Sequence, residues 1–175
     1  SLDFAMIGCG QRAYIGQLVP LAEPDARVTV AVDTSPLGRA RARQMFGDDV
    51  RVYDDLPSML AAERALTAAI VCTPDDAHLA DASALLHVGV PVYLEKPMTV
   101  HTADADRLLD AAAASERMLF VGHNMRYMSV VETMKSLIDD GAIGAVQAVW
   151  CRHFVGNGGD YYYRDWHADR SRSNS

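Results

Sequence analysis

Long apolar runs, an excess of basic residues and paired cysteines are all missing from this chain, and each absence excludes a class of protein. No apolar run approaches the roughly 18 residues that a membrane-spanning helix needs. Acidic residues outnumber basic ones, 23 to 16, and the net charge of -7 argues against nucleic acids or anionic membranes as partners. The three cysteines are odd in number and mostly in apolar settings, which favours buried thiols in a reducing compartment over a disulfide framework.

The composition is otherwise that of a globular protein, with 50% hydrophobic and 22% charged residues. The N-terminal stretch SLDFAMIGCG has no basic segment and enters a strand pattern at once, so we expect no secretory signal. The histidines and neighbouring acids show no spacing typical of a metal site. The sequence therefore predicts a cytoplasmic, acidic protein without a metal, a nucleic-acid partner or a membrane partner.

Strand-like and helix-like segments alternate through the first two thirds of the chain. Continuous apolar runs, typical of parallel strands covered on both faces, lie at 4–7, 28–32, 68–72, 90–94 and 118–121. Helical patterns lie between them, at 12–22, 37–46, 77–87 and 103–115, and a short helix follows Asp55. This alternation predicts an α/β fold with a doubly wound parallel sheet of the Rossmann type.

The pattern changes near residue 123. A long helix is predicted over 129–140, and AVQAVWCRHFV (145–155) alternates like a half-exposed strand. We therefore expect two units, a Rossmann domain over 1–122 and the start of a second α/β (α+β) domain over 123–175. The second domain would be truncated, with only the first strand of its sheet.

The segment GCGQRA directly follows the first predicted strand and matches G-x-G-x-x-G/A. Gly8 permits a tight turn, Gly10 lets backbone N–H groups approach a pyrophosphate, and Ala13 lets the helix pack close to the strand. The helix N-terminus adds a partial positive charge for the phosphates. Asp33 ends the second predicted strand, where a carboxylate that binds ribose hydroxyls belongs. Together these residues favour a dinucleotide site over a purely structural turn.

Asp33 also bears on the choice of cofactor. Its carboxylate would repel a 2′-phosphate, which favours NAD over NADP. Asp33 could instead cap the next helix, but Thr34 or Ser35 could serve that purpose. Arg39 and Arg41, on the next predicted helix, could shift the preference, so NADP stays open as the alternative.

The segment TPDDAH begins where the third apolar run ends. Ligands of open parallel sheets bind beyond the carboxyl ends of strands, which places Thr73 and Pro74 at such a site. Asp75 or Asp76 is expected to cap the following helix. His78 lies in its first turn and is either a ligand contact or a solvated histidine.

The fourth apolar run ends abruptly in Glu95, Lys96 and Pro97. Oxidation of a carbinol by hydride transfer needs a base for the hydroxyl proton, and the reverse reaction needs an acid. A positively charged nicotinamide beside Lys96 would favour the neutral amine, which accepts protons. Glu95 would point to the opposite face, because successive strand side chains alternate. The alternative is a Glu–Lys surface pair at a strand end.

The order and spacing of GCGQRA, Asp33, TPDDAH, EKP and GHNMRYM resemble those of the Gfo/Idh/MocA oxidoreductases, named after glucose–fructose oxidoreductase, inositol dehydrogenase and a rhizopine-catabolism protein. The resemblance covers nearly the whole chain, and EKP after a strand is its most specific part. It implies NAD(P)-dependent oxidation or reduction of sugars, inositols or related polyols. It also implies a second domain with a large open sheet, through which the complete protein would form a homo-oligomer, a dimer or tetramer.

The resemblance also implies a role for individual residues. Along the cofactor they would be, in order, Gly8, Gly10, Gln11, Arg12 and Ala13 at the pyrophosphate, Asp33 at the adenosine ribose with Thr34 beside it, then Thr73, Pro74 and His78, and Glu95 near the nicotinamide ribose. Lys96 would meet the substrate, while Asn124 and Arg126 would close over the nicotinamide end. The histidine that completes the catalytic set of the family would lie downstream of this sequence.

Two further substrate contacts are open. Arg126 could hold a polyol or a carboxylate, or it could cap the domain interface. Trp166, next to His167, could stack against a sugar ring, or both could lie in a solvated polar loop.

We therefore expect an NAD-dependent oxidoreductase that transfers a hydride between nicotinamide and the hydroxyl or carbonyl carbon of a sugar, inositol or polyol, with Lys96 as the acid/base. Two alternatives come from other classes. One is a non-catalytic regulator that senses NAD or a sugar on the same fold. The other is an NAD-using glycosidase that oxidises its substrate only transiently.

Overall fold

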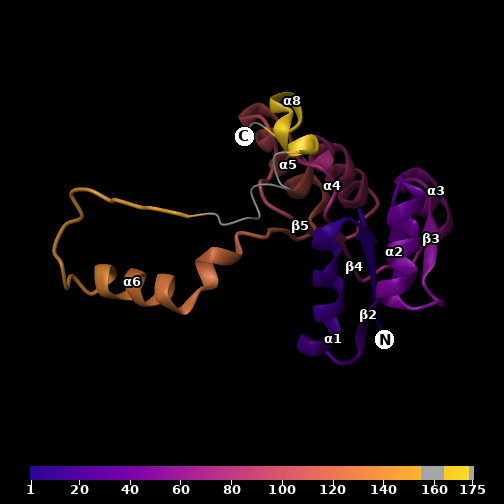
Figure 1. Cartoon of the computed structure of the whole chain (residues 1–175), viewed down its shortest axis with the longest axis horizontal. Helices are drawn as coiled ribbons and strands as arrows, with labels where there is room; N and C mark the ends of the chain where they lie inside the picture. The colour runs from indigo at the N-terminus through magenta and orange to yellow at the C-terminus, as the bar shows by residue number, and fades with distance from the viewer. Residues whose placement is uncertain (155–163, 174–175) are drawn as a thin grey trace.

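The computed structural model describes residues 1–154 and 164–173, and a six-stranded parallel sheet forms the core of residues 1–121 (Figure 1). The strand order is β3-β2-β1-β4-β5-β6, and every neighbouring pair is parallel. From β1 the chain adds β2 and β3 on one side and then β4, β5 and β6 on the other side. Doubly wound sheets bind their ligands at such a switch point, which here lies between β1 and β4. The strands are β1 (Leu2–Ile7), β2 (Ala26–Val32), β3 (Arg51–Tyr53), β4 (Ala68–Val71), β5 (Val92–Leu94) and β6 (Leu119–Val121).

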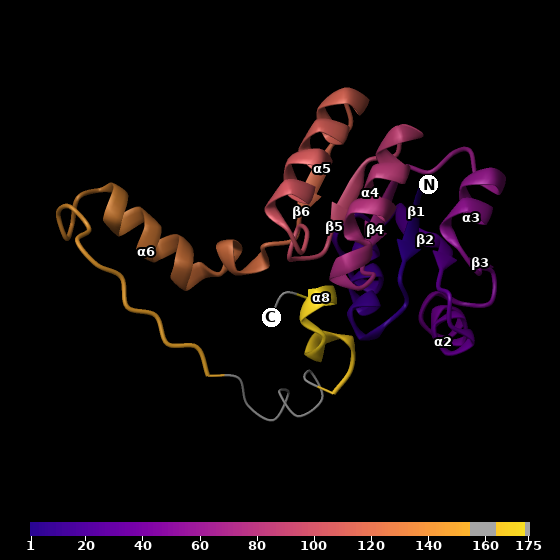
Figure 2. The same ribbon diagram turned by 90° about the horizontal axis from the view of Figure 1, so that it is seen from above.

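Helices cover both faces of the sheet (Figure 2). One apolar cluster joins the sheet to α3, α4 and α5, and a second joins it to η1 and α2. The helices are η1 (Gln11–Leu18), α1 (Val19–Ala22), α2 (Pro36–Phe46), α3 (Leu56–Ala62), η2 (Asp75–Ala77), α4 (His78–His87), α5 (Thr102–Ser115), η3 (Asn124–Tyr127), α6 (Ser129–Asp139), η4 (Trp166–Ala168) and α8 (Arg170–Ser173).

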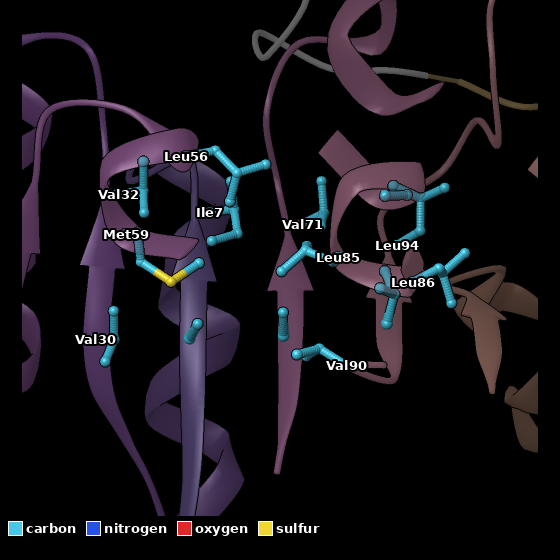
Figure 3. Packing of buried hydrophobic residues seen from close by; sticks show 14 of the residues in the cluster. Ile7, Val30, Val32, Leu56, Met59, Val71, Leu85, Leu86, Val90 and Leu94 are labelled. Atoms are coloured by element: carbon cyan, nitrogen blue, oxygen red, sulfur yellow. The ribbon is translucent and has the colours of Figure 1, made fainter. Parts of the chain in front are cut away.

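The core explains why the strands read as continuous apolar runs. Ile7, Val71 and Leu94 come from three adjacent strands and lie in the same cluster as Met59 of α3 and Leu85 of α4 (Figure 3). All five side chains are at most 1% exposed. Burying a side chain of this size contributes about 1.5–3 kcal/mol, so this cluster holds the three strands and the two helices together.

The structure confirms the predicted Rossmann-type sheet and its five predicted strands, with small shifts at their ends. β5 begins at Val92 rather than Val90, because Pro91 has no N–H to give to a neighbouring strand. The sequence missed β3, a three-residue edge strand that is too short for a periodic pattern. The helix predicted over 12–22 is present, but Gln11–Leu18 is a 3₁₀ helix. Gly16 and Pro20 both disfavour a regular α-helix there.

The strand predicted over 145–155 is wrong for residues 145–154, which have no regular structure; Val155 lies outside the described residues. A strand is stabilised by hydrogen bonds to a neighbour, and the alternating pattern alone does not provide one. The preceding helix α6 extends away from the sheet (Figures 1 and 2). Apolar side chains from this part of the chain are exposed, among them Val130, Met134, Leu137, Val149, Trp150 and Phe154.

Among residues 1–154 and 164–173, none of the helices combines the length and the apolarity of a bilayer-crossing segment. The same residues contain no group of three or more His, Cys, Asp or Glu side chains arranged to hold a metal ion.

Candidate active site

The glycine turn lies at the switch point of the sheet, between the ends of β1 and β4. Gly8 has a φ of +85°, and a Cβ on it would lie 2.8 Å from backbone atoms of Cys72 and Thr73. Only glycine tolerates both this dihedral angle and this approach. A Cβ on Gly10 would meet no atom within 4 Å, so there is open space above the turn. Ala13 is fully buried and packs η1 against the sheet.

The carboxylate of Asp33 is held in place beside this turn. The backbone N–H of Cys9 donates to Oδ2 at 2.8 Å, and the backbone N–H and hydroxyl of Ser35 donate to Oδ1 at 2.8 and 2.7 Å. A carboxylate oxygen accepts about two hydrogen bonds, so Oδ2 keeps one acceptor position among the described contacts. Ser35 itself caps α2, and Asp33 is therefore not the N-cap.

Gly38, which the sequence did not identify, belongs to the same arrangement. A Cβ on this residue would lie 2.1–2.3 Å from three carboxylate atoms of Asp33. Two arginines of α2 flank it: Arg39 donates to the carbonyls of Asp33 and Thr34, both at 2.9 Å, and Arg41 donates to the carbonyl of Cys9 at 3.2 Å. The only signal in the sequence for this role of Gly38 is a glycine in the first turn of an otherwise regular helix.

An ion pair joins the glycine turn to the end of β5. Arg12 Nε donates to Glu95 Oε1 at 2.6 Å, and the backbone N–H of Lys96 donates to Oε2 at 2.9 Å. Glu95 is 5% exposed, whereas Lys96 is exposed, so the two side chains are in different environments. In the described part of the chain Lys96 forms no ion pair, which excludes the alternative of a Glu–Lys surface pair.

The loop after β4 is organised around its polar side chains. The Thr73 hydroxyl donates to Asp81 at 2.8 Å, and burial raises the pKa of Asp81 while this hydrogen bond opposes the rise. His78 is 1% exposed, with Nε2 3.0 Å from the Thr73 carbonyl oxygen and Nδ1 2.8 Å from that of Pro97. The interpretation of His78 as a solvated histidine is therefore wrong.

Asp75 and Asp76 do not cap α4, contrary to expectation; its N-cap is Ala77, without a side-chain bond. The turn of η2 precedes α4, and neither carboxylate accepts from the first N–H groups of that helix. Asp75 is 7% exposed, and burial raises its pKa against the attraction of His78, Lys96 and His167. Asp76 forms an ion pair with Arg172 at 3.0 Å.

That ion pair brings residues 164–173 to the carboxyl edge of the sheet, close to η2. Trp166 is half-buried and stacks on His167, with ring centroids 3.6 Å apart. One face of the indole is thus covered by the chain itself. Contact of Trp166 with a sugar stays a prediction.

The residues predicted to close the nicotinamide end follow β6. Asn124 and Arg126 lie on η3 and are exposed. Gln11 and Thr34 are exposed near the glycine turn and Asp33, and Pro74 is half-buried. Their contacts with a cofactor or substrate stay predictions, although β1, β2, β4 and β6 bring all of these loops to one edge of the sheet.

Comparison with known proteins shows the family to which the chain belongs. A family described as "Oxidoreductase family, NAD-binding Rossmann fold" (GFO_IDH_MocA) matches residues 2–123. The chain belongs to the Gfo/Idh/MocA oxidoreductases. It is 34% identical over 129 residues to inositol 2-dehydrogenase 1 of Saccharopolyspora erythraea, covering 73% of this chain and 38% of that protein. Identity to inositol 2-dehydrogenase of Rhizobium meliloti is 26% over 149 residues, covering 85% and 44% of the two chains.

Solved structures of Gfo/Idh/MocA-like dehydrogenases share the fold. The WlbA dehydrogenase of Bordetella pertussis, in complex with NADH and UDP-GlcNAcA, aligns with a TM-score of 0.77 at 25% identity, over 82% of this chain and 44% of that chain. Apo scyllo-inositol dehydrogenase of Lactobacillus casei aligns with a TM-score of 0.73 at 19% identity, over 82% and 43%. The chain therefore spans about four-tenths of the length of the curated relatives it matches.

The residues present fit a nicotinamide dinucleotide. The open space above Gly10 leaves room for a pyrophosphate, and Asp33 Oδ2 keeps an acceptor position for a ribose hydroxyl. The Arg12–Glu95 pair then links this part of the site to Lys96.

Proposed function

We propose that the protein oxidises or reduces a hydroxyl-bearing carbon of a sugar, inositol or related polyol, with NAD as the cofactor and Lys96 as the acid/base. The observation that carries the proposal is the environment of Lys96. Its side chain is exposed at the carboxyl end of β5, while Glu95 is buried and tied to Arg12 of the glycine turn. A nicotinamide bound along this edge supplies the hydride acceptor or donor.

Lys96 handles the proton of this reaction. In the oxidation, the substrate carbon loses a hydride, the hydroxyl proton passes to the amine of Lys96, and the carbonyl product forms. The resulting ammonium releases its proton to water, because the side chain is exposed. In the reduction the ammonium donates the same proton. Glu95 does not pair with the side chain of Lys96, since its carboxylate is buried against Arg12 whereas the Lys96 side chain is exposed.

The choice of NAD over NADP is supported by the surroundings of Asp33. A 2′-phosphate beside this carboxylate would be repelled. The nearest arginines are engaged elsewhere: Arg39 binds two backbone carbonyls and Asp54, and Arg41 binds the Cys9 carbonyl. Among the described ion pairs none joins either arginine to the Asp33 carboxylate, so the negative charge beside the ribose position is not neutralised there.

The proposal extends to the remainder of the chain. We assign residues 1–122 to the cofactor domain and place the start of a second, substrate-binding and oligomerising domain at residue 123. Exposed apolar side chains on α6 and beyond, such as Leu137, Val149 and Trp150, support this division. Light scattering coupled to gel filtration tests whether the protein forms an oligomer. A monomer at all concentrations would contradict the proposed oligomerisation through the second domain.

The test of function combines turnover with a single substitution. NADH absorbance is followed across a panel of inositols, sugars and sugar acids, with the enzyme at its full natural length. Lys96→Met should lower kcat by roughly 10²- to 10⁴-fold, which is the usual contribution of a positioned acid or base, while the Kd of NAD stays close to that of the wild type. Near-normal turnover by Lys96→Met on the identified substrate would exclude Lys96 from the chemistry.

A further inference from the structure

His78 connects the two loops that flank the reacting end of the site. Its ring is 1% exposed, and its two nitrogens lie 2.8 Å from the Pro97 carbonyl oxygen and 3.0 Å from the Thr73 carbonyl oxygen. Pro97 follows Lys96 directly, and Thr73 follows β4. The histidine side chain therefore joins the segment that carries the acid/base to the loop beside the glycine turn.

Both partners of the ring are acceptors, and this limits its protonation state. A neutral imidazole carries one N–H and one lone pair, so it can donate to only one of the two carbonyls. Its other nitrogen would then turn a lone pair toward a carbonyl oxygen at about 3 Å. An imidazolium donates to both, and only this form satisfies both distances at once.

The charged groups around His78 are consistent with a cationic ring. Asp75 of η2 and Asp81 of α4 both interact electrostatically with His78. Asp76, Lys96 and His167 also act on these carboxylates. Of the two nearby carboxylates, Asp81 already accepts from Thr73, and Asp75 is buried without a side-chain hydrogen bond among the described contacts.

We propose that His78 is a positioning residue that, as an imidazolium donating to both carbonyls, ties the loop after β4 to the segment after β5 and so fixes the place of Lys96. This rests on the proposed function and deepens it. Loss of the second ring proton leaves one bond and one repulsive contact. A ring with a single N–H would therefore hold only one of the two segments.

The first test needs no substitution and no turnover. Protein labelled with ¹⁵N gives a long-range ¹H–¹⁵N spectrum in which protonated and unprotonated ring nitrogens have different shifts. We expect two protonated nitrogens for His78 at neutral pH. His87, exposed at the other end of the same helix, gives the spectrum of a solvent-exposed ring for comparison. A single protonated nitrogen on His78 at neutral pH would overturn the double donor.

The second test measures position. In His78→Gln and in the non-polar His78→Phe, hydrogen exchange at the Lys96 amide should accelerate about tenfold or more, as expected for one lost hydrogen bond. The full-length enzyme should lose kcat by a similar factor, with the Kd of NAD nearly unchanged. His87→Gln should leave both quantities at their wild-type values. Wild-type exchange at Lys96 in both His78 variants would overturn the positioning role.

These outcomes separate the two proposals. The ¹⁵N spectrum and the exchange rate report on His78 whether or not the enzyme turns over. Wild-type activity of Lys96→Met would contradict the proposed function, but it would not affect the proposal that His78 donates to the carbonyls of Thr73 and Pro97.

Discussion

Replacing Gly38 with alanine tests whether the carboxylate of Asp33 binds the cofactor. The added methyl would lie 2.1–2.3 Å from three carboxylate atoms, where ordinary contact begins at 3.4 Å. The carboxylate must then withdraw by roughly 1 Å or rotate away. Either movement disrupts its hydrogen bonds to Cys9 and Ser35 and its alignment with a ribose hydroxyl.

The expected loss of affinity follows from one charge-assisted hydrogen bond. Such a bond contributes about 1.5–3 kcal/mol, so the Kd of NAD should rise by roughly 10- to 150-fold in a calorimetric titration. The free energy of unfolding should change less than the free energy of NAD binding. Alanine is favoured over glycine inside a helix by up to about 1 kcal/mol, which offsets part of the cost of the displaced carboxylate. Leu37→Ala, at the exposed neighbouring position, is the matched control and should bind NAD normally.

A double-mutant cycle decides whether the methyl acts through Asp33. In an Asp33→Ala background the carboxylate is gone, and Gly38→Ala should then cost no further affinity. An equal loss in both backgrounds, or wild-type affinity of the single Gly38→Ala variant, would refute the reasoning.

Three more predictions concern charges. NAD should bind more tightly than NADP in a fluorescence titration, and Asp33→Ala should narrow the gap; equal affinities in the wild type would contradict the assignment. Glu95→Gln should destabilise the protein by about 1–3 kcal/mol in urea, because the amide removes the negative charge opposite the half-buried guanidinium and leaves one acceptor oxygen for two donors, Arg12 Nε and the Lys96 N–H; an unchanged midpoint would show that the pair contributes nothing. Arg51 hydrogen bonds lower the pKa of Glu63, so this carboxylate stabilises the fold at neutral pH and the contribution is lost as pH falls through its folded-state pKa. Glu63→Gln should therefore cost up to about 1 kcal/mol at pH 7 and nothing in strong acid, and a pH-independent difference would rule this linkage out.

The sheet and the glycine turn could be predicted because their physical causes are local in sequence. Apolar runs such as 28–32 give strands that are buried on both faces, and Gly8 marks the turn between β1 and η1. The position of Asp33 after β2 follows from the same register. These features depend on neighbours within about one strand–helix unit.

Contacts between distant segments could not be predicted in this way. One of the two carbonyl oxygens beside the His78 ring belongs to Pro97, 19 residues away, and Arg172 reaches Asp76 across 96 residues. Gly38 matters because of the Asp33 rotamer, which no sequence pattern specifies. The strand predicted over 145–155 is wrong within residues 145–154 for the opposite reason: the local pattern is present there, but no strand in the described part of the chain pairs with it.

The cysteines offer a practical consequence of the way the glycine turn is packed. Burial raises the pKa of the Cys9 and Cys72 thiols to about 12, whereas Cys151 is exposed after α6. Alkylating reagents attack thiolates, so at neutral pH a maleimide dye should react at Cys151 and spare the other two. The native sequence thus carries a selective labelling position, and a fluorophore there would report changes in the surroundings of residue 151 without any cysteine having to be removed.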